Sequence, residues 1–120
     1  MAAVLMSAWL VACAAAWDRS TASGGPATGA AAARIAYEVA SASRLSGRCR
    51  MLAERLADAS IRARVAGMRP TGRRMRAAEA GAWDAWEAAR CPERALPGIA
   101  FGVASAVNAD EEGRRLGGLR

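Results

Sequence analysis

The sequence predicts an all-α protein, a small alanine-rich helical hairpin or bundle with an apolar helix near each end. Alanine, the strongest helix former, fills 33 of the 120 positions. The stretch from Ala30 to Met68 contains no proline, and its large apolar and basic residues recur with the 3.6-residue period of a helix. Prolines and glycines gather at 20–29 and 69–72, where they favour a linker and a turn.

The stretch from Ala30 to Met68 is predicted to form one long amphipathic helix. At 100° per residue, its arginines share one narrow sector and its larger apolar residues share the neighbouring one. The basic stripe comprises Arg44, Arg48, Arg55, Arg62 and Arg69, and the apolar stripe comprises Leu45, Cys49, Leu52, Leu56 and Ala59. An i,i+4 ion pair is expected between Asp58 and Arg62. The basic stripe predicts contact with anionic lipid or nucleic acid, and the alternative is a solvated helix face.

Large apolar side chains are scarce, because Leu, Ile, Val and Phe together fill only 18 of 120 positions. This share lies below about 20%, the level under which a packed globular core becomes doubtful. Ile61 and Val65 also project from the side opposite Leu52 and Leu56, so this end of the helix has two faces to cover. We therefore expect helices that form readily, pack thinly and draw stability from a membrane, a partner or self-association.

Met1 to Trp17 carries no charge and would extend about 25 Å as a helix, against about 30 Å for the hydrocarbon core of a bilayer. The leading interpretation is a retained membrane helix, with Arg19 and Arg34 behind it favouring a cytoplasmic location for most of the chain. One alternative is a secretory signal that is cleaved, or lipidated at Cys13. The other alternative is an alanine-rich core helix.

A Gly/Ser/Thr linker is expected at 18–29, followed by a basic helical hairpin at 30–91. The hairpin turns at 69–72, and its second helix is expected to begin near Arg73. Arginines at the start of a helix are unfavourable unless an anion binds the free amides there. The predicted phosphate site comprises Arg69, Arg73, Arg74 and Arg76, and the alternative is a set of screened surface arginines.

The last third of the chain carries the remaining packing signals. Trp83 and Trp86 share a helix face and are expected in the core against the apolar stripe, with an interfacial membrane anchor as the alternative. An apolar helix is expected at 92–109 and a polar tail at 110–120, frayed from Gly113 onward. The apolar helix carries a ladder of small residues that would let another helix approach closely, namely Gly98, Gly102 and Ala106.

The sequence excludes the commonest catalytic designs. It contains no histidine, so it offers no Ser-His or Cys-His pair and no His-ligated metal. Cys13, Cys49 and Cys91 are odd in number and lack CxxC spacing, and Cys49 is expected to be a buried, unreactive thiol on the apolar stripe. We therefore expect no enzymatic activity, no cofactor and no metal site.

The expected binding surface lies in the middle of the chain, because residues 34–76 contain 11 arginines and only 3 acidic residues. The leading hypothesis is a non-enzymatic membrane-associated accessory protein, whose basic hairpin contacts anionic headgroups or a larger protein assembly. The first alternative is a soluble nucleic-acid-binding module that contacts phosphate through the Arg69–Arg76 turn. Further alternatives are a structural subunit, a homo-oligomer, or a weakly selected reading frame, since arginine without lysine also follows the codons of a GC-rich genome.

Overall fold

The computed structural model describes residues 25–67 and 70–117. Within these ranges the chain forms α2 (Gly25–Ser43), α3 (Gly47–Ala66), α4 (Pro70–Ala88), the short 3-10 helix η1 (Glu93–Ala95) and α5 (Leu96–Gly117). No strand occurs in the described residues, which confirms the all-α prediction.

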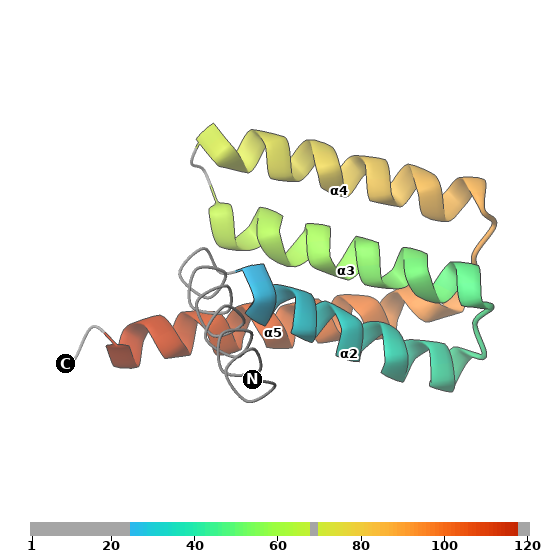
Figure 1. Cartoon of the computed structure of the whole chain (residues 1–120), viewed down its shortest axis with the longest axis horizontal. Helices are drawn as coiled ribbons and strands as arrows, with labels where there is room; N and C mark the ends of the chain where they lie inside the picture. The colour runs from blue at the N-terminus through green and yellow to red at the C-terminus, as the bar shows by residue number, and fades with distance from the viewer. Residues whose placement is uncertain (1–24, 68–69, 118–120) are drawn as a thin grey trace, which may run out of the picture.

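The helices are arranged around α3 (Figure 1). In this view α4, α3 and α2 lie side by side, and α5 passes behind them at the level of α2 and α3. α3 packs against α2, α4 and α5, whereas α4 contacts no other described helix than α3. α3 is therefore the central element, and the bundle is open between α4 and α5.

The prediction of one helix from Ala30 to Met68 is wrong, because the chain reverses at residues 44–46. Arg44 takes a positive φ of 52°, and the Leu45 amide donates to the Ala40 carbonyl oxygen at 3.1 Å, which closes the end of α2. Ser46 then caps α3, its Oγ accepting a hydrogen bond from the Cys49 amide at 3.2 Å. The chain therefore turns at residues 44–46 although helix periodicity continues on either side. The predicted hairpin at 30–91 contains three helices.

Two predicted boundaries also move. α2 already begins at Gly25, inside the linker predicted at 18–29. α4 begins at Pro70 instead of Arg73, because proline suits the first position of a helix, where a backbone N–H would have no partner. The start of α4 lies close to the end of α3: Gly67 has a φ of 59°, and a Cβ atom on Gly72 would collide with the Gly67 carbonyl oxygen.

The core of the described residues is thin. Eight of the seventeen buried apolar residues in the described ranges are alanines. Leu56 and Ile61 project from different sides of α3, yet both are buried, because α2, α4 and α5 surround that helix. The expectation that the end of this helix needs an external partner to cover its second face is therefore wrong for Ile61.

α5 is longer than predicted and approaches α2 closely. It continues through the expected polar tail to Gly117, with an Arg114–Asp110 ion pair of 3.0 Å in its last turns. Near its start, a Cβ atom on Gly102 would lie 2.7 Å from Ile35 Cγ1, and one on Gly98 would lie 3.2 Å from Val39 Cγ2. The small residues of α5 therefore pack against α2, a helix of the same chain.

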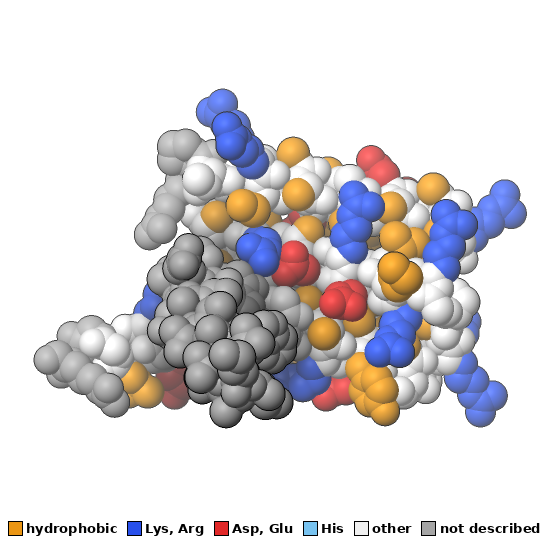
Figure 2. Space-filling model, in the orientation of Figure 1, with side chains coloured by type: hydrophobic (Ala, Val, Ile, Leu, Met, Phe, Trp, Pro, Cys, Tyr) orange, Lys and Arg blue, Asp and Glu red, His pale blue; other side chains and the backbone are white. Residues whose placement is uncertain are grey.

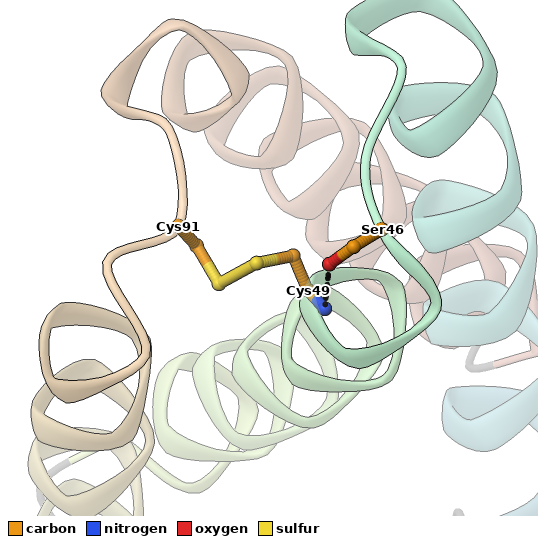
Figure 3. Close-up of a disulfide and its surroundings, with 3 residues drawn as sticks. All are labelled: Ser46, Cys49 and Cys91. Atoms are coloured by element: carbon orange, nitrogen blue, oxygen red, sulfur yellow. Dashed lines mark hydrogen bonds between the residues drawn. A yellow bond between two sulfur atoms is a disulfide. The ribbon is translucent and has the colours of Figure 1, made fainter.

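A disulfide joins Cys49, in the first turn of α3, to Cys91, just after α4 (Figure 3). The two Cα atoms lie 5.6 Å apart, and the bond closes a separation of 42 residues. The prediction that Cys49 is a free, unreactive thiol is therefore wrong, although its burial is confirmed. The bond therefore ties the segment after α4 to the start of α3, the helix on which α4 packs.

None of the described helices is long and apolar enough to cross a bilayer. The expected apolar helix at 1–17 lies outside the described residues, as do Cys13 and Arg69.

We predict that loss of the disulfide strongly destabilises the fold. In the chain-entropy model, a loop of this length contributes about 4 kcal/mol, so Cys91→Ala or reduction should lower the urea midpoint accordingly. Amide exchange should increase most in α4, which would keep only its contacts with α3. Equal midpoints for the oxidised and the reduced protein would contradict this assignment.

We also predict opposite effects of alanine at two glycines of α5. Gly102→Ala should destabilise the protein by about 1–2 kcal/mol, because the new methyl group overlaps Ile35 by more than the gain in helix propensity offsets. Gly113→Ala should be neutral or stabilising, since no atom lies within 4 Å of its added Cβ. Urea unfolding of both variants measures the difference, and a stabilising Gly102→Ala would refute the close contact with α2.

Candidate anion-binding surface

The arginines of the predicted basic stripe do not form one surface. Arg44 lies in the turn between α2 and α3, whereas Arg48 and Arg55 are exposed on α3. Arg62 pairs with Asp58 at 3.0 Å, which confirms the expected i,i+4 ion pair. The stripe is divided because the helix on which it was placed ends at Ser43.

The predicted phosphate site at the start of α4 is only partly available. Arg73 and Arg74 are exposed in the first turns of α4. Arg76, however, donates through Nη1 to the Gly67 carbonyl oxygen at 3.0 Å. A cation at the C-terminus of α3 is favourable, so this arginine has a structural role that the α4 sequence alone could not indicate.

The structure brings together a different set of arginines, at the end of the bundle that holds the disulfide. Arg48 and Arg50 flank Cys49, and Arg90 directly precedes its partner Cys91. Arg94 Nη2 donates to the Ser43 carbonyl oxygen at 2.8 Å, which places its guanidinium group beside the turn that contains Arg44. We name this surface the arginine end; its members are Arg44, Arg48, Arg50, Arg90 and Arg94.

All five side chains of the arginine end are exposed. The ion pairs of the described chain involve Arg62 and Arg114 and none of these five. Glu87 and Glu93 line a hollow of about 340 Å³ together with Arg90. Figure 2 shows several basic side chains projecting from this end of the molecule, at the right of the view. The surface is therefore basic and open to an anion.

Two members of the arginine end have an unfavourable backbone conformation. Arg44 and Arg90 are the positive-φ residues other than glycine in the described ranges, with φ values of 52° and 55°. Each follows the end of a helix, α2 or α4, at the position where glycine is normally preferred. The left-handed conformation costs a residue other than glycine about 1–2 kcal/mol. Backbone geometry therefore does not explain the presence of arginine at either position.

An exposed aromatic ring lies next to the arginine end. The Arg50 guanidinium carbon stands 5.6 Å from the centroid of the Tyr37 ring, within the range of a cation–π contact. Tyr37 is exposed on α2. The contact therefore places the amphipathic side chain of Tyr37 beside the arginine end.

The two tryptophans differ in burial. Trp86 lies in the core, whereas Trp83 is 37% exposed and lines a groove of about 470 Å³ between α4 and α5. The groove contains the apolar side chains of Leu56, Leu96, Ile99 and Val103, and its charged residues are Arg64, Glu79 and Glu93. It lies where α4 and α5 make no contact.

Nothing in the described ranges gathers three potential metal ligands from histidine, cysteine, aspartate and glutamate. The arginine end offers guanidinium donors, and the chemistry that such donors support is anion binding. Comparison with known proteins adds no constraint: the chain matches no family model, no curated protein and no solved structure.

Proposed function

We propose that this protein is a non-enzymatic accessory protein that binds an anionic phospholipid surface through its arginine end. One observation carries the proposal: five exposed arginines lie at one end of the bundle, where the Cys49–Cys91 disulfide joins the start of α3 to the segment after α4. Arginine binds phosphate oxygens through a planar fork of N–H donors, which suits lipid headgroups. Each basic residue near such a surface contributes about 1 kcal/mol to binding.

The positive φ of Arg44 and Arg90 supports this proposal. Glycine at either position would relieve backbone strain, so each arginine there carries a local conformational cost. A cation at the C-terminus of a helix interacts favourably with the helix dipole, which offsets part of this conformational cost. Anion binding is the second contribution that we propose for these two side chains, and an experiment can separate it from their interaction with the helix dipoles.

Tyr37 favours a membrane surface over nucleic acid as the partner. An exposed tyrosine next to arginines suits the headgroup zone, where an apolar ring and a polar hydroxyl are both accommodated. The arginine end is formed by turns and the first turn of α3, so it presents no helix side that could lie along a DNA groove. The nucleic-acid alternative remains a distinguishable outcome of the binding experiment.

The disulfide also bears on the compartment. Disulfides persist in secreted, periplasmic or luminal proteins and are rare in the cytoplasm. The sequence led us to expect a cytoplasmic location; in view of Cys49–Cys91, we propose instead that the arginine end acts in an oxidising compartment.

The double substitution Arg44→Gly/Arg90→Gly should increase stability while weakening membrane binding. Glycine removes left-handed strain of about 1 kcal/mol at each site, less what is lost from the helix dipoles. Removing two charges should cost about 2 kcal/mol of binding, or roughly a 30-fold weaker partition into vesicles. Urea unfolding measures the first effect, and co-sedimentation with phosphatidylglycerol/phosphatidylcholine vesicles measures the second.

The matched control is Arg73→Gln/Arg74→Gln, which removes the same charge from the start of α4. It should change vesicle binding by less than about threefold, because those side chains lie outside the arginine end. Equal losses in the two double variants would show that binding follows net charge alone and would refute the proposal. Tight binding to duplex DNA without binding to vesicles would replace it with the nucleic-acid alternative.

A further inference from the structure

The outward face of α5 is unusual for so basic a protein, because the helix carries no charged residue from Leu96 to Ala109. The residues of its outer ridge recur every three or four positions and point away from the buried Ile99 and Val103. The ridge comprises Pro97, Phe101, Ala104 and Asn108. Phe101 is 77% exposed, which leaves a phenyl ring projecting into solvent.

Both sides of this ridge are hollowed. On one side lies the groove of about 470 Å³ between α4 and α5, into which Trp83 and Leu96 face. On the other side lies a smaller hollow of about 180 Å³ between α2 and α5. Charges of both signs border each hollow: Arg64, Glu79 and Glu93 the first, Arg34 and Glu38 the second.

We propose that this face binds a second copy of the chain, with the two α5 ridges packed against each other about a two-fold axis. The whole chain has a net charge of +6, so two copies repel each other wherever their basic surfaces meet. The α5 ridge, which is exposed except at the half-buried Ala104, brings no charge into the contact. Because each flank offers both signs, two copies related by a two-fold axis can bring opposite charges together on either side.

The side chains of the ridge suit such a contact. Ala104, with Ala100 one turn before it, is small enough to let two helices approach closely. Phe101 is the one bulky aromatic residue on the ridge, and in a two-fold arrangement each Phe101 enters the groove between α4 and α5 of the other copy. There it would lie near Trp83, as an aromatic pair.

The extent of the ridge limits the affinity. Fourteen residues of helix extend about 21 Å, so the contact lies at the small end of specific interfaces, which commonly bury about 800 Å² on each partner. We therefore expect a dimer with a dissociation constant in the micromolar range. This proposal does not depend on lipid binding, since no member of the arginine end lies on α5.

Sedimentation velocity of the full chain from 1 to 200 µM, in buffer with 150 mM salt, tests the proposal. The wild-type protein should change from monomer to dimer over this range. Phe101→Glu should weaken dimerisation at least 50-fold, because it places a carboxylate in the contact, and circular dichroism should show an unchanged helix content. The matched control is Met51→Glu on α3, where the side chain is 72% exposed; it should dimerise like the wild type.

Three outcomes would overturn the proposal. A wild-type monomer throughout the range would mean that another segment, another protein or nothing covers the ridge. Association that survives Phe101→Glu would place the contact elsewhere on the chain. A Phe101→Glu variant that loses vesicle binding while self-association is unchanged would assign the ridge to the membrane. Arg44→Gly/Arg90→Gly should still dimerise, which separates this test from that of lipid binding.

Discussion

The Cys49–Cys91 disulfide is the constraint on which the arrangement of this protein depends. Nearly half of the buried apolar residues in the described ranges are alanines, each of which buries little area, and α4 contacts no described helix other than α3. A covalent bond at the end of α4 compensates for contacts that such a helix lacks. The same bond holds two turns together and so creates a basic surface from residues that are far apart in the sequence.

The arginines serve two different purposes. Arg76 and Arg94 donate to the carbonyl oxygens of Gly67 and Ser43, and so satisfy the C-terminal ends of α3 and α2. Arg62 and Arg114 pair with acids one turn away on their own helices. The remaining members of the arginine end have exposed side chains. The high arginine content is thus partly structural, and the proposed function rests on the side chains of the arginine end.

Helix periodicity in the sequence was enough to predict the all-α class, the burial of Cys49 and Leu56, and the Asp58–Arg62 pair. It could not locate the break at residues 44–46, because Ser46 is a single capping residue within a regular helical pattern and the positive φ of Arg44 is a property of the backbone that the sequence does not display. The arginine end was missed for the same reason. Its segments are brought together by the Cys49–Cys91 pairing and by the Arg94–Ser43 hydrogen bond, which their sequence spacing does not reveal.

The most direct test of this account is peptide mapping of the purified protein by mass spectrometry without reduction, after free thiols have been blocked. The account predicts a linked pair of peptides that contains Cys49 and Cys91 and that separates on reduction. Free thiols at both positions, or a bond from either one to Cys13, would contradict it. In that case the two turns would have no covalent reason to present their arginines on one surface.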